Sequence, residues 1–226
     1  MTYSLVLLML LSLGVLLYFT YKPYKNFRGI FKIITSLLFI SIAVSGYVES
    51  NNNFNYFIFI FISLVFSLLG DVFLIFEKGD TSSMSKAFVY GLLSFSIAHI
   101  FFSIGFIYLS YFSIYNILFT LLLSILLLVV LKSIKSFDFK GAFFYVAFYS
   151  IVISFMFIQS LTLYYYISSS NPCTILITIG ALLFVLSDLI LAFDYFHINC
   201  PKFMPVINLL VYYIAQLLLA LSVLYI

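Results

Sequence analysis

Two aspartates lie inside long apolar stretches of this 226-residue chain, where carboxyl groups are rare. Asp71 precedes Glu77 by six residues, and Asp188 precedes Asp194 by the same interval. At the rise of an α-helix, six residues place each aspartate about 9 Å inside the acidic residue that closes its stretch. A carboxylate at this depth in hydrocarbon is costly unless it is paired, protonated or facing a wet cavity. The two aspartates are therefore candidates for acid–base chemistry, against the alternative of inert helix packing.

Further polar residues follow at helical spacing and predict which helix faces point inward. They are Ser63 and Ser67 before Asp71, then Gly91, Ser96 and Ser103 on one stripe with His99, and finally Asn208, Tyr212 and Gln216 at intervals of four. Since residues three or four apart share a helix face, we expect these stripes to converge on one polar chamber. His99 is open to a catalytic or ligand role and to a structural hydrogen bond. Gln216 is open to helix packing as well as chemistry.

The elements that position these residues are membrane-spanning helices. Hydrophobic residues make up 65% of the chain and charged residues 8%. A lipid-exposed backbone must satisfy its own hydrogen bonds, and the apolar runs lack the alternation of a membrane β-barrel. We therefore predict an all-α bundle of about eight transmembrane helices in one domain, residues 1–226. The expected spans are residues 4–20, 30–48, 55–76, 87–109, 113–131, 141–166, 173–196 and 204–225.

The basic residues predict the orientation of the spans. They fall in or beside the odd-numbered connections: Lys22, Lys25, Arg28 and Lys32 at the first, Lys78 and Lys86 at the third, Lys132, Lys135 and Lys140 at the fifth, and Lys202 at the seventh. Under the positive-inside rule this face is cytoplasmic, which places both termini on the opposite side. The basic residues form no stripe that could follow a phosphate backbone, so we expect no nucleic-acid partner. His197 is interpreted as an ordinary loop residue.

A repeated pattern relates the two halves of the chain. Both aspartates stand in the order Leu, small residue, Asp, two apolar residues, Leu, apolar residue, Phe, acidic residue, at 69–77 and 186–194. At 28 residues after each aspartate, an Ala is followed by a polar residue, which is His99 in the first half and Gln216 in the second. We expect a parallel duplication, residues 1–112 and 113–226, with the site where the halves meet.

Four segments carry a family resemblance as an ordered set. They are FSLLGDVFLIF at 66–76, YGLLSFSIAH at 90–99, GALLFVLSDLILAF at 180–193 and YYIAQ at 212–216, with a Lys-Pro pair at 22–23. Together they resemble the YhhN-type lysoplasmalogenase family, whose members have eight spans. The resemblance implies hydrolysis of the vinyl ether bond of lysoplasmalogens, which releases a fatty aldehyde and a glycerophospho-base.

Under this resemblance the polar residues take roles in vinyl ether hydrolysis, which begins with protonation of the carbon β to the oxygen. Two aspartates facing each other in a membrane cavity could share one proton, so Asp71 and Asp188 are expected to be acid and base, without an assignment of which is which. The expected helpers are His99 as a further catalytic residue, Tyr90, Tyr213, Gln216 and Asn208 around the substrate, Asp194 at a headgroup entrance, and Lys22 or another cytoplasmic basic residue on the phosphate.

The expected partners are a lysophospholipid substrate and the lipid bilayer, in a bacterial inner membrane or the endoplasmic reticulum. Headgroup preference, chain length and oligomeric state stay open. Intramembrane aspartyl proteases carry the motif GxGD, whereas position 68 here is Leu. The chain has two histidines, fewer than metal-dependent membrane hydrolases use, so we expect neither metal nor cofactor. A small transporter or lipid-moving protein is the remaining alternative, because buried carboxylates and a parallel repeat suit it equally.

Overall fold

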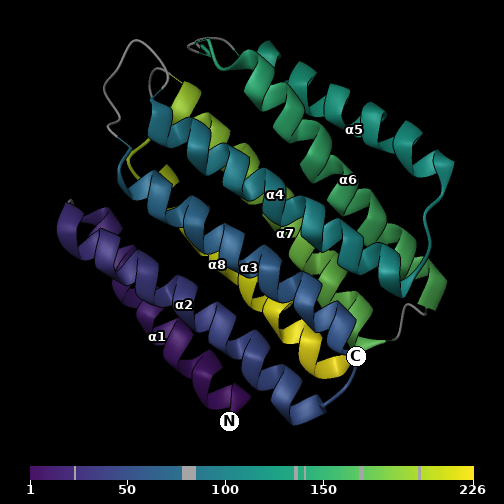
Figure 1. Ribbon diagram of the computed structural model, residues 1–226. Helices are drawn as coiled ribbons and strands as arrows, with labels where there is room; N and C mark the ends of the chain where they lie inside the picture. Colours follow the sequence, from purple (N-terminus) through teal and green to yellow (C-terminus); the bar gives the residue numbers. More distant parts are fainter. Residues whose placement is uncertain (23, 78–84, 135–136, 140, 168–170, 198–199) are drawn as a thin grey trace.

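The structure is a computed structural model that describes all residues except 23, 78–84, 135–136, 140, 168–170 and 198–199. Eight long helices form the described part of the protein (Figure 1). They are α1 (Thr2–Tyr21), α2 (Lys25–Ser50), α3 (Phe54–Ile75), α4 (Lys86–Leu109), α5 (Ile114–Ser133), α6 (Phe143–Ile167), α7 (Pro172–Phe196) and α8 (Met204–Leu221), followed by a short 3-10 helix, Ser222–Tyr225. All eight are long and apolar enough to cross a membrane. The predicted all-α membrane bundle is confirmed.

Polar side chains mark where several helices begin. Asn53, Ser85, Ser113 and Asn171 each precede a helix, and each side chain accepts a hydrogen bond from a backbone N–H of the first turn. Such caps satisfy donors that the first turn of a helix leaves unpaired. Most helix bounds agree with the predicted spans to within a few residues. Pro23, Lys78, Lys135 and Lys140, which served the sequence predictions, lie outside the described residues.

Helix α2 departs from its predicted span at the end that matters for the site. It begins at Lys25 rather than at residue 30, so Arg28 lies on the same helix as Lys32 and not in a connection. Lys32 is buried, with 5% of its surface exposed. The prediction that the basic residues only report topology is therefore wrong for Lys32.

The helices are arranged so that each half of the chain reaches into the other. Helices α1 and α2 lie at one edge of the bundle and α5 and α6 at the opposite edge (Figure 1). Between these edges α3 packs against α4, and α7 packs against α8. The halves meet where α2 contacts α8 and where α6 contacts α4. This order of contacts suits a parallel repeat, and the duplication itself stays a prediction.

Glycines bring the two central helix pairs close together. A Cβ atom added to Gly70 of α3 would lie 2.7 Å from the ring of Phe95 on α4. A Cβ atom added to Gly180 of α7 would lie 3.0 Å from Leu219 on α8. Small residues at such contacts let membrane helices pack backbone to backbone. Because Gly70 immediately precedes Asp71, the first of these contacts also holds the candidate carboxylate in place.

The connection between α5 and α6 pairs with the end of α7. Phe137 and His197 form an isolated antiparallel bridge, and the Asp138 N–H donates to the Phe196 carbonyl at 2.9 Å. The Phe196 ring also packs edge-on against Phe88 of α4, with 5.7 Å between ring centres. These contacts join α4, the end of α7 and the connection between α5 and α6 on the side that carries most of the basic residues.

Candidate active site

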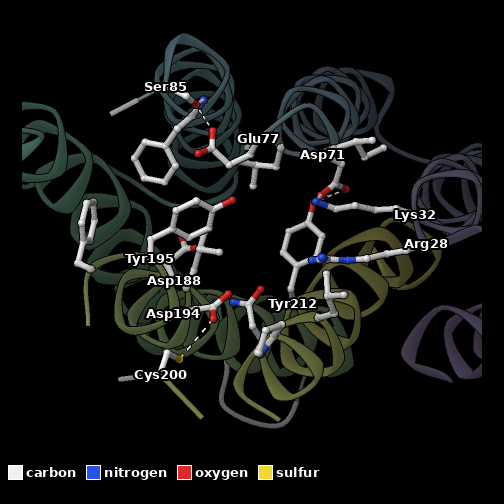
Figure 2. Close-up of a pocket in the computed structure, with 18 of the residues that line it drawn as sticks. Arg28, Lys32, Asp71, Glu77, Ser85, Asp188, Asp194, Tyr195, Cys200 and Tyr212 are labelled. Atoms are coloured by element: carbon white, nitrogen blue, oxygen red, sulfur yellow. Dashed lines mark hydrogen bonds and ion pairs between the residues drawn. The ribbon is translucent and has the colours of Figure 1, made fainter. Parts of the chain in front are cut away.

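A cavity of about 740 Å³ lies among α2, α3, α4, α7 and α8 (Figure 2). Five of the seven acidic residues of the chain line it. The charged lining residues are Lys25, Arg28 and Lys32 from α2, Asp71 and Glu77 from α3 and its end, Asp138 from the fifth connection, and Asp188 and Asp194 from α7. Because only 8% of all residues are charged, this concentration makes the cavity the candidate active site.

Asp71 is held in the cavity wall by a cation and two hydroxyl groups. Its Oδ1 lies 3.2 Å from the ammonium of Lys32, and both side chains are buried. Its Oδ2 accepts hydrogen bonds from Ser36 at 2.6 Å and from Tyr212 at 2.9 Å. Lys32 and Ser36 come from α2, and Tyr212 comes from α8. The carboxylate charge is thus balanced by a lysine and shared with the nearby hydroxyl groups.

Asp188 has partners of a different kind. The Tyr149 hydroxyl of α6 donates to its Oδ2 at 2.5 Å, and Nε2 of His99 on α4 lies 3.7 Å from the same oxygen. The side chain of Asp188 is 13% exposed, compared with 2% for Asp71. Asp188 therefore presents the more accessible carboxyl group to the cavity.

Both predicted aspartates line one cavity, but each is bound by its own partners rather than by the other aspartate. The stripes predicted to converge do so in part, since Asp71, Asp188, Asn208 and Tyr212 all reach the cavity. His99 is fully buried behind it and contacts Asp188 instead of Asp71.

Tyr213 and Gln216, predicted to contact substrate, lie behind the cavity wall. Tyr213 is fully buried, and its hydroxyl donates to the Lys32 carbonyl at 3.0 Å. The Gln216 amide donates to the Tyr212 hydroxyl at 3.1 Å. Their contacts therefore support Lys32 and Tyr212, two of the residues that hold Asp71, and the Tyr213 hydroxyl also makes a long hydrogen bond to Asp71 Oδ2 at 3.5 Å.

Asn208 and Asp194 do line the cavity, near its α7 and α8 side. The Asn208 amide donates to the Ser187 carbonyl at 2.6 Å, which ties α8 to the residue before Asp188. Asp194 accepts a hydrogen bond from the Cys200 thiol at 3.3 Å. Loss of solvation, together with the neighbouring carboxylate, raises the pKa of Cys200 to about 12, so the thiol remains a donor at neutral pH.

Two other predicted residues are not brought to the cavity. Lys22 ends α1, and its ammonium lies 5.2 Å from the ring centre of Tyr18. Tyr90 is 52% exposed and packs against Phe73. By contrast His197, interpreted from the sequence as an ordinary loop residue, lines the cavity.

The sequence predictions missed Arg28, Lys32 and Tyr149 as site residues. Arg28, Lys32 and Ser36 follow one another at intervals of four, so they share one helix face, and that spacing could have revealed an inward-facing basic stripe. Tyr149 is one of 19 tyrosines, and nothing in its local sequence distinguishes it.

Opposite charges lie on opposite walls of the cavity. Figure 2 shows Arg28 and Lys32 on one side, and Asp194 and Tyr195 across the open space from them. The first wall belongs to α2 and the second to α7. Across the parts of the chain that the structure describes, no group of three or more His, Cys, Asp or Glu residues is placed to hold a metal ion. The arrangement can bind a ligand that carries both an anionic and a cationic group.

Residues 27–223 match the YhhN family model, a segment that includes both aspartates. A curated relative, lysoplasmalogenase TMEM86A of Bos taurus, is 34% identical over 166 residues, which make up 72% of this chain and 64% of the bovine protein. The chain thus spans less than two thirds of the length of that relative. No solved structure matches this chain. Since the family match covers nearly the whole helix bundle, this chain belongs to the YhhN family.

Proposed function

We propose that this protein is a membrane hydrolase that cleaves the vinyl ether bond of lysoplasmalogens. The name of the bovine relative supports the reaction class. The observation that carries the proposal is that two aspartates with unlike partners face one cavity within the helix bundle. Paired carboxylates in unlike surroundings are the usual device by which enzymes divide acid and base roles.

Asp188 is the general acid in this proposal. Its hydrogen-bond partner Tyr149 is neutral, and its carboxyl group is the more exposed of the two. A proton on Asp188 is therefore compatible with its contacts and can reach a substrate in the cavity. General acid catalysis requires such a protonated group within hydrogen-bonding distance of the reacting atom.

Asp71 is the ionised partner. The Lys32 ammonium at 3.2 Å balances its negative charge, and Ser36 and Tyr212 donate to one of its oxygens. A carboxylate held in this way stabilises a cation that forms nearby and orients the water that attacks it. The proposal therefore assigns the two roles that the sequence left open.

The reaction follows from these roles. Asp188 donates its proton to the β carbon, the C=C electrons form the new C–H bond, and an oxocarbenium ion results beside the Asp71 carboxylate. Water adds to the cationic carbon and releases a proton, which returns to the Asp188 carboxylate. The hemiacetal then breaks its C–O bond to the glycerol oxygen while its hydroxyl group loses a proton to that oxygen, and the products are a fatty aldehyde and the glycerophospho-base.

The charged walls suggest how the substrate lies. Arg28 and Lys25 on α2 hold the phosphate, a role expected from the sequence for Lys22 or another cytoplasmic basic residue. The amine of the headgroup points toward Glu77 and Asp194 on the other side of the cavity. The hydrocarbon chain remains in the bilayer, so only the polar part of the lipid needs to enter.

We further propose that the cavity opens toward the cytoplasm. Lys25, Ser85, Asp138 and Cys200 line it and lie at the first, third, fifth and seventh connections, which carry the basic residues. By the positive-inside rule this side is cytoplasmic and both termini are not. Reporter fusions to each terminus test the orientation, and a cytoplasmic reporter at either end would contradict it.

The deciding experiment gives purified protein in detergent a lysoplasmalogen and its saturated ether analogue, and measures aldehyde. We expect aldehyde from the vinyl ether alone. No aldehyde from folded protein would contradict the hydrolase proposal. In that case lipid flux across proteoliposomes, without product, would identify the transporter alternative.

A further inference from the structure

We infer that Tyr149 and His99 form a proton relay that loads Asp188, an inference that rests on the proposed hydrolysis. The Tyr149 hydroxyl lies between the two other groups, 2.5 Å from Asp188 Oδ2 and 2.8 Å from His99 Nε2. The three residues come from α6, α7 and α4. The Asp188 end faces the cavity, and the His99 end is fully buried.

The donor and acceptor inventory of these groups allows two states. The Tyr149 hydroxyl has one hydrogen, so it donates either to Asp188 or to His99 at any moment. On the far side of the ring, His99 Nδ1 lies 3.2 Å from the sulfur of Met156. A thioether accepts weakly and cannot donate, so Nδ1 carries the proton of the neutral ring. Nε2 is then free to gain or lose a proton through Tyr149.

In the loaded state the Asp188 carboxyl donates to the Tyr149 oxygen, Tyr149 donates to Nε2, and His99 is neutral. In the stored state Nε2 carries the proton and donates to Tyr149, which donates to an ionised Asp188. Passing from the first to the second breaks the Asp O–H bond and forms a Tyr O–H bond, while the original Tyr O–H bond breaks and an N–H bond forms. No atom other than hydrogen moves far, and no proton enters or leaves.

The surroundings of His99 keep this proton inside the relay. Tyr149 from α6 and Asp188 from α7 are the titratable groups that face the ring in the described structure. Phe184 packs edge-on against the ring with 4.6 Å between centres, and Met156 covers Nδ1. A proton held on His99 can therefore return to Asp188 through Tyr149. His99 and Tyr149 are positioning residues here, since only Asp188 reaches the substrate.

Nitrogen-15 NMR of histidine tests the relay without any substrate. The chain has two histidines, so His197→Gln leaves the ring of His99 as the single labelled imidazole. In this background we expect Asp188→Asn to convert His99 to the neutral form protonated at Nδ1. We expect Tyr149→Phe to change the His99 spectrum as well, and Asp188→Asn to add much less once Tyr149 is absent.

Two outcomes of this test would overturn the relay. If Asp188→Asn leaves the His99 signals unchanged while Tyr149 is present, the two ends are not linked by a shared proton. If Asp188→Asn has its full effect in the Tyr149→Phe background, the direct contact of His99 with Asp188 at 3.7 Å is the link and Tyr149 has no part in it.

Aldehyde release provides the second arm. We expect Tyr149→Phe to lower kcat by roughly 10-fold to 100-fold with KM unchanged, less than removal of the acid itself. Tyr145→Phe, on the same helix with 43% of its surface exposed, is the matched control and should behave as wild type. If wild-type protein releases no aldehyde but the NMR coupling is present, the proposed hydrolysis fails and the proton link stands. If aldehyde is released but the NMR coupling is absent, the proposed hydrolysis stands and the relay is wrong.

Discussion

Residues at corresponding positions in the two halves contact the two aspartates, yet these partner residues differ in charge. Asp188 follows Asp71 by 117 residues, and Tyr149 follows Lys32 by the same 117. In each half, this residue is the partner that the preceding helix supplies to its aspartate, a lysine for Asp71 and a tyrosine for Asp188. The correspondence supports the predicted duplication. It also teaches that one backbone arrangement can give its aspartate either a cationic or a neutral partner, depending on a single residue.

The partners from the other half differ as well. Tyr212 of α8 donates to Asp71, and the residue 117 positions before it is Phe95, which cannot donate through its side chain. Asp188 instead contacts His99, whose counterpart 117 positions later is Gln216. Gln216 does not reach Asp71 directly but donates to Tyr212. The first half-site, Asp71 with its partners, thus consists of a carboxyl group and hydrogen-bond donors. The second half-site, Asp188 with its partners, contains a tyrosine and a histidine, which can each donate or accept a proton.

Exchanging the acid for an amide makes the largest change to the second half-site. We expect Asp188→Asn to lower kcat for vinyl ether cleavage by about 10²-fold to 10⁴-fold, because an amide cannot supply the proton. Aldehyde release by purified protein is the measurement. Glu49→Gln, which changes an acidic residue that does not line the cavity, is the control and should retain kcat. Near-normal turnover in Asp188→Asn would transfer the acid role to another residue.

Around Asp71, removal of the Lys32 ammonium should have the largest effect on the stability of the protein. Lys32→Met leaves Asp71 buried without a counter-charge, and we expect unfolding in detergent to become easier by about 3–5 kcal/mol. A second substitution, Asp71→Asn, should restore much of this stability but not activity. If the single variant is as stable as wild type, Lys32 does not balance Asp71 in the folded protein.

The α2 wall offers a test of substrate binding with smaller effects. We expect Arg28→Gln to raise KM for lysoplasmalogen by about 10-fold with kcat retained, since a charged hydrogen bond to phosphate contributes roughly 1.5–3 kcal/mol. Lys22→Gln, which alters a lysine outside the cavity, is the matched control and should leave KM unchanged. An equal rise in both variants would indicate general attraction to the bilayer rather than a phosphate site.

The smallest expected effect concerns the opposite wall. Glu77→Gln should raise KM for an ethanolamine substrate by a few-fold, because a primary ammonium donates hydrogen bonds to carboxylates. A substrate of the same chain length without an amine should bind both proteins alike. The ratio of the two KM values is the measurement, and an unchanged ratio would place the amine elsewhere.

Hydropathy was sufficient to predict the eight spans, because a helix that crosses the bilayer needs a long apolar stretch and satisfies its backbone hydrogen bonds internally. It also singled out Asp71 and Asp188, which interrupt those stretches. Side-chain partners follow from helix rotation and start points, which hydropathy does not determine. Thus Tyr213 was predicted to contact substrate where its neighbour Tyr212 reaches the cavity, about 100° away around the helix. Lys32 lies inside both the predicted and the observed second helix, and hydropathy does not indicate that its side chain turns inward to Asp71.

Each aspartate also takes a partner from the opposite half, since Tyr212 belongs to α8 and His99 to α4. A symmetric pair of identical four-helix chains could build both half-sites, but one gene would then place the same residue at positions 32 and 149. Joined in one polypeptide, the halves mutate independently while remaining at fixed stoichiometry. Covalent linkage thus permits a lysine beside one aspartate and a tyrosine beside the other, so that two carboxyl groups of common position differ in their surroundings.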